Sequence, residues 1–177
     1  PTAAKVARTV AALDRAPGAS LAVKTALVLH GLSNAELDEY WLRKLVYPRR
    51  VMRETLRIVR FMRSFTPEAL DDDAGLRRFL SEVGRRHAPA FFEAWRAWRS
   101  GKQARLLQER AAAILARGDA LNTNELALNG HDVQKLLPGV TGPAVGATLN
   151  RLLRHVLEHP EDNTRERLAE LVCSRSG

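Results

Sequence analysis

The stretch PRRVMRETLRIVRFMRS, residues 48–64, divides into an apolar face and a basic face when its residues are placed on a helix. The apolar face holds Val51, Thr55, Ile58, Val59 and Met62. The basic face holds arginines at spacings of four, four and three, namely Arg49, Arg53, Arg57 and Arg60, with Arg50 and Arg63 at its edges. Pro48 stands in the first turn, which tolerates proline. The pattern predicts a helix that packs by one face and presents guanidinium groups on the other.

The rest of the chain also reads as helices, because Val, Ile and Thr are scattered and no stretch alternates as a strand would. Turn and cap signals place further helices at approximately residues 2–14, 20–30, 34–45, 74–86, 89–100, 102–117, 132–137 and 143–158. Residues 118–122 read as a linker. We therefore predict an all-α fold, with a multi-helix body over residues 1–118 and a smaller helical tail over residues 119–177.

Composition narrows the class of protein. Apolar residues make up 45% of the 177, which is enough for a packed core. No apolar run approaches the roughly 18 residues that a membrane span needs, so no membrane partner is expected. The single cysteine, Cys173, excludes an internal disulfide and fits a reducing compartment, which favours a cytoplasmic location.

The net charge of +8 is concentrated in two central stretches. Residues 41–63 carry eight basic side chains against Glu54 alone, and residues 77–110 carry nine basic against three acidic ones. Such stretches suit a polyanion, because neutralising phosphates releases counterions. The candidate RNA-binding residues are Arg49, Arg50, Arg53, Arg57 and Arg60 in the first stretch and Arg96, Arg99, Lys102 and Arg105 in the second. A solvated helix surface and an acidic protein partner remain alternatives.

The tail contains a second candidate site, at the start of the helix expected over residues 143–158. Gly142 and Gly146 carry no side chain that would obstruct approach to this helix end, and Pro143 suits the first helical position. Unpaired amides and the positive end of the dipole make a helix N-terminus suitable for a phosphate. Close packing between helices is an alternative reason for the two glycines.

The tail motifs together resemble a known family. Its elements are Gly130-His131-Asp132-Val133, then Gly142-Pro143-Ala144-Val145-Gly146, a leucine-rich helix, and Asn163-Thr164-Arg165-Glu166-Arg167-Leu168. This order is similar to the tail of bacterial CCA-adding enzymes and their poly(A) polymerase relatives. Val133 and Val145 depart from the family pattern by conservative apolar exchanges. Residues 20–64 resemble the family's body moderately, and residues 66–118 only loosely.

The resemblance implies a function. Members of this family extend RNA 3′ ends with C and A residues, using a separate nucleotidyltransferase head that binds Mg²⁺ with ATP or CTP. The body and tail hold the tRNA. The head of this family is marked by a strand followed by Gly-Ser and a pair of carboxylates, and this sequence shows no such pattern. We therefore expect the chain to be the RNA-binding C-terminal portion. It would have no catalytic residue and no cofactor of its own. Its partners would be tRNA or another RNA 3′ region and a head in the same chain or in another.

Three other motifs suggest metal chemistry but lack the expected context. Asp71-Asp72-Asp73 contains a D-x-D pair outside any strand. His155-Val156-Leu157-Glu158-His159 matches a zinc-binding string but ends against Pro160. His30-Gly31 stands where a metal phosphohydrolase would have His-Asp. We predict no metal site. Phe92, Trp95 and Trp98 are expected to form core, with base stacking as the alternative.

Overall fold

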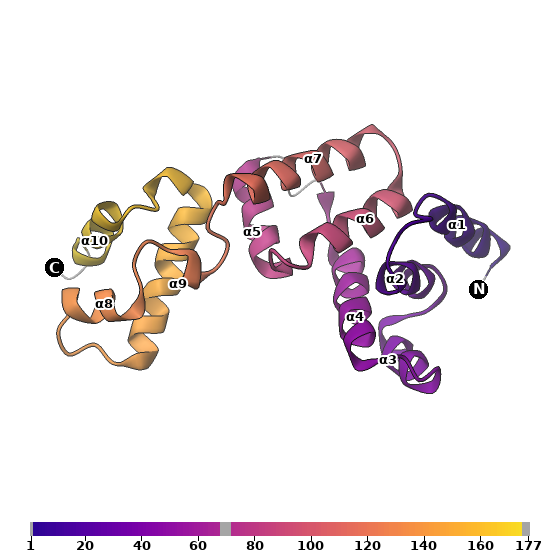
Figure 1. The fold of residues 1–177 in the computed structure, drawn as a ribbon, viewed down its shortest axis with the longest axis horizontal. Coiled ribbons are helices and arrows are strands. Elements are labelled where there is room, and N and C mark those ends of the chain that lie inside the picture. The colour runs from indigo at the N-terminus through magenta and orange to yellow at the C-terminus, as the bar shows by residue number, and fades with distance from the viewer. Residues whose placement is uncertain (1, 68–71, 175–177) are drawn as a thin grey trace. The chain divides into compact units, whose positions relative to one another are not determined.

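The computed structural model describes residues 2–67 and 72–174. Within these residues there are ten α-helices and no strand, which confirms the predicted all-α fold (Figure 1). The helices and two short 3-10 turns are α1 (Ala3–Asp14), α2 (Leu21–Leu32), α3 (Ala35–Lys44), α4 (Arg49–Ser64), α5 (Asp73–Val83), α6 (Ala88–Arg99), α7 (Lys102–Arg117), η2 (Thr123–Glu125), α8 (Gly130–Leu136), α9 (Gly142–Glu158), η3 (Pro160–Asp162) and α10 (Arg165–Cys173). Among these residues, none of the helices combines the length and apolar character that crossing a bilayer requires.

Polar side chains fix several helix starts where the sequence predicts them. The Ser20 hydroxyl accepts a hydrogen bond from the Val23 amide at 3.3 Å, and the Asn34 side chain accepts one from the Leu37 amide at 3.0 Å. These bonds satisfy amides that have no partner inside the helix.

The first compact unit comprises residues 2–67 and 85–112. Its central helix is α2, which contacts α1, α4 and α6 (Figure 1). Val23, Ala26 and Leu27 of α2 are fully buried. An aromatic cluster joins α4 to α6, because Phe65 meets Phe91 and Trp95 with ring centroids 5.1 and 4.7 Å apart. The core of this unit is therefore apolar and aromatic.

Gly31 lies inside α2 rather than just beyond its end, where the sequence placed it. A Cβ at this position would lie 2.0 Å from the Thr9 hydroxyl oxygen and 3.1 Å from the Trp98 ring. The glycine permits α1 and α6 to approach α2 closely, and the helix continues through it to Leu32.

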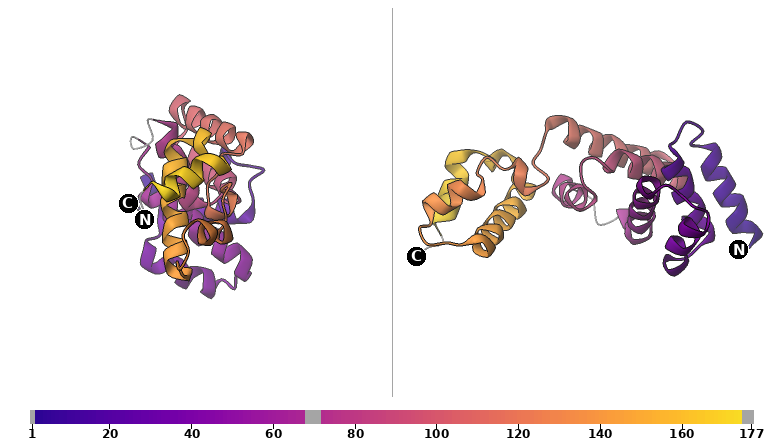
Figure 2. Two further views of the ribbon diagram at one scale, coloured as in Figure 1. Left: turned by 90° about the vertical axis from the view of Figure 1, so that its left-hand side faces the viewer. Right: turned by 60° about the horizontal axis from the view of Figure 1, so that its bottom comes forward.

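The second compact unit comprises residues 72–84 and 113–174. Here α9 is central and contacts α5, α8 and α10, as the two views of Figure 2 also show for α8 and α10. Leu128, Leu152, Val156 and Leu168 are almost completely buried in its core.

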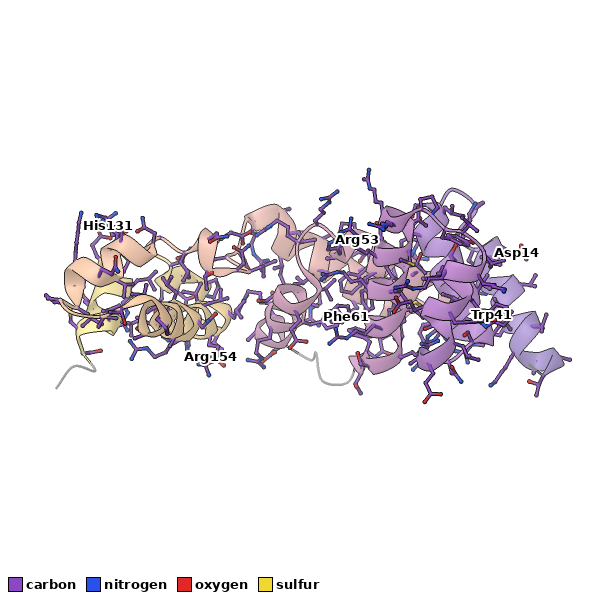
Figure 3. All side chains as sticks on the ribbon, turned by 90° about the horizontal axis from the view of Figure 1, so that it is seen from below. Asp14, Trp41, Arg53, Phe61, His131 and Arg154 are labelled. Atoms are coloured by element: carbon purple, nitrogen blue, oxygen red, sulfur yellow. The ribbon has the colours of Figure 1, made fainter. Side chains whose placement is uncertain are left out.

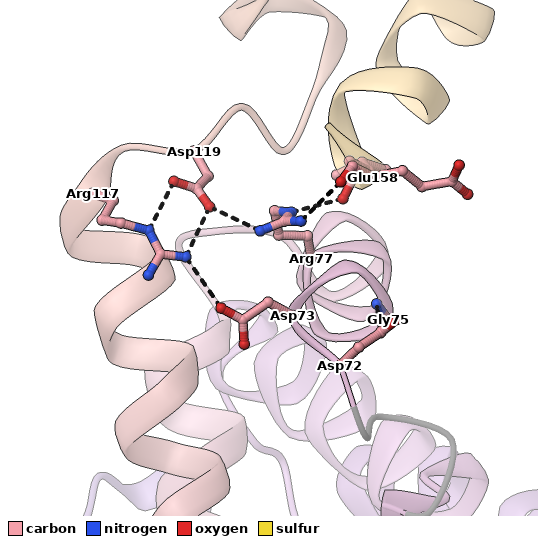
Figure 4. A network of polar contacts seen from close by, with 8 residues as sticks. Asp72, Asp73, Gly75, Arg77, Arg117, Asp119 and Glu158 are labelled. Carbon is pink, nitrogen blue, oxygen red and sulfur yellow. Dashed lines mark hydrogen bonds and ion pairs between the residues drawn. The ribbon is translucent and has the colours of Figure 1, made fainter. Parts of the chain in front are cut away.

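This division differs from the expected boundary near residue 118. The last turns of α7 belong to the second unit, and so does α5, which the sequence reading assigned to the body. A buried arginine explains why α5 packs with the tail. Arg77 of α5 donates from Nε to the Leu157 carbonyl at 2.7 Å and from a terminal nitrogen to the Glu158 carbonyl at 3.3 Å (Figure 4). It therefore caps the C-terminus of α9.

A polar network continues from Arg77. Its other terminal nitrogen pairs with Asp119 at 3.4 Å, and Arg117 bridges Asp119 and Asp73 at 3.2 and 3.5 Å (Figure 4). Arg77 and Asp119 are both more than nine-tenths buried, which makes their pairing obligatory. These ion pairs connect α5, the end of α7 and the residue after it within the second unit, although the segments are distant in sequence.

Candidate nucleic-acid interface

The two faces of α4 are confirmed by the structure. Thr55, Ile58, Val59 and Met62 are buried, while Val51 is partly buried. The Thr55 hydroxyl donates to the Ala22 carbonyl of α2 at 3.3 Å. The apolar face is therefore fixed against the core of the first unit, and this holds the opposite face in a defined direction.

The opposite face carries an arginine row, which we define as Arg49, Arg50, Arg53, Arg57 and Arg60, all exposed. Figure 3 labels Arg53 within it. Residues four apart on a helix are separated by about 6 Å along its axis, so the row forms a line of positive charge. In the part of the chain that the structure describes, no carboxylate forms an ion pair with Arg49, Arg50 or Arg53. These guanidinium groups are available to an external anion.

Arg63 is an exception to the predicted basic face. Its guanidinium pairs with both oxygens of Asp38, which is 2% exposed, and donates to the Leu29 carbonyl at 3.1 Å. Arg63 therefore joins α4 to α3 and to the end of α2. It stabilises the fold and is not part of the arginine row.

The arginine row reaches the beginning of α6. Burial lowers the pKa of His87, which precedes α6, and the positive charge of Arg57 lowers it further, while Glu54 opposes this effect. Arg57 therefore lies close enough to His87 to influence it, which places this part of the row near the N-terminal end of α6.

The second group of predicted residues, Arg96, Arg99, Lys102 and Arg105, is also exposed. Arg99 lies over the Trp95 ring, with its central carbon 5.1 Å from the ring centroid. Arg96 and Arg105 line a hollow together with Arg15, a residue that the sequence reading did not select. Arg15 lies far from both along the chain, so no local pattern connects the three.

Arg57 of the first basic group and the residues of the second group lie toward different ends of α6. Arg57 is near His87 at the N-terminal end of α6, whereas Arg96 and Arg99 are in its last turns. Twelve helical residues span about 18 Å. A ligand that touches both groups would have to extend along α6, as a nucleic-acid backbone can.

The aromatic residues of α6 form core, as predicted. Phe91, Phe92, Trp95 and Trp98 are all at least nine-tenths buried. His30 meets Trp98 edge-on with ring centroids 4.6 Å apart. Burial, followed by the positive charge of Arg63, lowers the pKa of His30 from 6.5 to about 4. His30 is therefore a neutral packing residue.

In the second unit, the N-terminus of α9 is open. Thr141, Gly142, Pro143 and Ala144 are exposed, and the Thr141 side chain makes no capping hydrogen bond. A Cβ added to Gly142 or Gly146 would meet nothing within 4 Å. Close packing within this unit therefore does not explain the two glycines, and that alternative is not supported.

The remaining tail motif residues stabilise the tail itself. Asn129 and Asp132 form a reciprocal capping box at the start of α8, which begins at Gly130 rather than at the expected residue 132. Hydrogen bonding from the Asn129 amide and the charge of Arg165 keep the pKa of Asp132 below its usual value. Asn163 accepts from the Ala127 amide at 2.9 Å and donates to the Glu125 carbonyl at 3.1 Å. These side chains hold the loops around α9.

The motifs that suggested metal chemistry have other roles. Asp71 lies outside the described residues, Asp72 caps α5 through the Gly75 amide at 2.6 Å, and Asp73 pairs with Arg117. His155 contacts Asp162, and His159 is 3.6 Å from Glu161. No group of three or more potential ligands is gathered for a metal anywhere in the described part of the chain.

Comparisons with known proteins give one structural likeness. No family model matches the sequence, and no curated protein matches it. The fold is similar to the crystal structure of the Bacillus stearothermophilus CCA-adding enzyme in complex with CTP, with a TM-score of 0.70 over 89% of this chain. The identity is 23%, so the likeness concerns the fold, and the chain spans 38% of that structure's length.

Proposed function

We propose that this chain is the RNA-binding, tRNA-anchoring portion of an enzyme of the tRNA nucleotidyltransferase and poly(A) polymerase type. The main observation that supports this proposal is the arginine row, which is exposed on a helix whose other face is buried against the core. The tail motifs and the fold likeness to a CCA-adding enzyme support the identity of the polyanion as tRNA. Charge without that likeness would fit any polyanion.

The row and the open end of α9 suit different parts of an RNA backbone. The arginines can pair with phosphates bidentately, whereas the α9 terminus offers backbone amides without side chains in the way. Both kinds of contact position an RNA without reading its bases. Transfer of nucleotides would need a nucleotidyltransferase head, in the same chain or in another, and that head would supply the Mg²⁺ and nucleotide sites.

The test is a titration of the purified chain with a tRNA transcript over a range of salt concentrations. We expect an affinity that falls steeply with salt. Arg49→Gln combined with Arg53→Gln should reduce the slope of log K against log salt by about 1 to 2, because each phosphate contact contributes nearly one unit. The fold should be retained, because both side chains are exposed.

A matched control combines Lys5→Gln with Arg8→Gln, which also removes two exposed charges from the first unit but lies on α1, outside both basic stretches. This control should change the slope much less than the row variant. A tRNA affinity that is independent of salt, or equal losses in the two variants, would refute the proposal.

A protein partner is the second candidate function, and a group of exposed apolar residues on α3 and in the turn after it favours this function. This group consists of Leu37, Tyr40, Trp41, Leu45 and Val46, which are 44, 52, 44, 64 and 84% exposed. Exposed groups of this kind, rich in aromatic residues, are typical of protein interfaces. The same titration separates the candidates, because a module that binds only protein would show no salt-dependent affinity for tRNA.

A further inference from the structure

Three arginines converge on a hollow in the first unit. The hollow has a volume of about 200 Å³ and lies where the residue after α1, the end of α6 and the start of α7 meet. Its lining consists of Arg15, Arg96, Ala97, Ser100, Gly101 and Arg105. Half of these six residues carry a positive charge.

Arg15 is fixed in place by the backbone of α6. Its Nε donates to the Ala97 carbonyl at 2.7 Å. Because a guanidinium has five N–H donors in a rigid fork, this bond orients the group and leaves the terminal nitrogens for another acceptor. The tether explains how a residue from another helix is held at the wall of the hollow.

The three arginines of the hollow, Arg15, Arg96 and Arg105, form no ion pair with a carboxylate of the described residues. Arg63 and Arg77, in contrast, are both satisfied by buried carboxylates. Like charges gathered around one hollow repel one another, and an anion in the hollow would remove this cost. The start of α7 adds the positive end of a helix dipole to the same place.

The geometry points to a terminal phosphate of an RNA, a phosphomonoester, as the ligand of this hollow, an inference that rests on the proposed function. A monoester carries up to two negative charges and three strong acceptor oxygens, which suits three converging guanidinium groups. An internal phosphodiester carries one charge and is matched better by a line of arginines such as the row on α4. The hollow therefore recognises an RNA end, whereas the row follows the chain.

The experiment compares one RNA hairpin in three forms, with a 5′-phosphate, with a 3′-phosphate, and with hydroxyl groups at both ends. We expect wild-type protein to bind one phosphorylated form about tenfold more tightly than the hydroxyl form. Arg15→Gln, at a residue outside the two predicted basic groups, should abolish this preference while leaving the affinity for the hydroxyl form nearly unchanged. Arg105→Gln should, separately, abolish the preference as well. The Arg105 side chain is exposed, so its variant guards against a loss of folding in the Arg15 variant.

The controls separate this inference from the proposed function. Lys5→Gln, which removes one charge from α1, should keep the preference. The variant with both Arg49→Gln and Arg53→Gln should bind all three RNA forms more weakly by the same factor, and it should also keep the preference for the phosphorylated form. Equal binding of the three forms by wild type, or a preference that survives both Arg15→Gln and Arg105→Gln, would refute the terminal-phosphate site but leave RNA binding intact. Failure to bind any form would refute both, and equally tight binding of a phosphoserine peptide would overturn the assignment to RNA.

Discussion

The arginine row on α4 and the Arg77 network of the second unit use the same residue type in opposite ways. In the row, Arg53 extends into solvent with no carboxylate partner among the described residues. In the network, Arg77 is 6% exposed and each of its three guanidinium nitrogens donates to an acceptor. The number of arginines alone therefore says little about RNA binding. What decides their role is whether internal acceptors lie within reach.

The largest effect is expected from breaking the network. Arg77→Gln should destabilise the second unit by about 2–4 kcal/mol, because it leaves two α9 carbonyls without their buried donor and leaves Asp119 with the half-exposed Arg117 as its ion-pair partner. Hydrogen exchange of the α5 and α9 amides measures this loss locally. Arg78→Gln is the matched control, because its ion pair with Glu158 is about half exposed and should contribute less than about 1 kcal/mol. Similar losses in the two variants would mean that burial does not separate the roles of these arginines.

A smaller effect concerns backbone strain in the two units. Val46 follows α3 with φ of 55°, a conformation that costs a residue with a Cβ about 1–2 kcal/mol. The Val46 and Tyr47 amides donate to the Arg43 and Leu42 carbonyls, so the chain is held in this conformation as a helix-ending turn. Val46→Gly should raise the free energy of unfolding by about 1 kcal/mol, as measured by thermal unfolding.

The second unit offers the reverse exchange as a control. Gly139 has φ of 90° and open space around it, so Gly139→Ala should lower stability by about 1–2 kcal/mol through backbone strain alone. If neither Val46→Gly nor Gly139→Ala changed the free energy of unfolding, the positive φ angles would not cost a residue with a Cβ the expected strain.

The smallest effect on stability tests the open end of α9. Gly146→Ala should stabilise the helix by up to about 1 kcal/mol, since the new methyl group meets no neighbour. The same change should weaken tRNA binding if an RNA backbone approaches this position. Ala147→Gly is the control, because it should lower stability and leave binding unchanged. A Gly146→Ala variant that is more stable and binds tRNA normally would exclude α9 from the interface.

Periodicity and cap signals were sufficient for nine of the ten helices of the described residues and for the two faces of α4, whereas they did not predict α10 (Arg165–Cys173). A 3.6-residue period depends on side chains within a few positions of one another, and the caps at Ser20 and Asn34 depend on residues three positions away. Such short-range relations can be read along the chain, and the exposed arginines of the row were predicted for this reason.

The tertiary structure alone decided which charges are internal and which are open. Arg63 shares the basic helix with Arg60, yet it finds Asp38, 25 positions away. Arg15 meets the Ala97 carbonyl across 82 positions, and Arg77 joins α5 to the tail across 80. These pairings depend on how helices pack, and no periodicity encodes the partner. The sequence by itself thus determined an all-α chain with a positive surface, while long-range packing determined where that charge remains free to meet an anion.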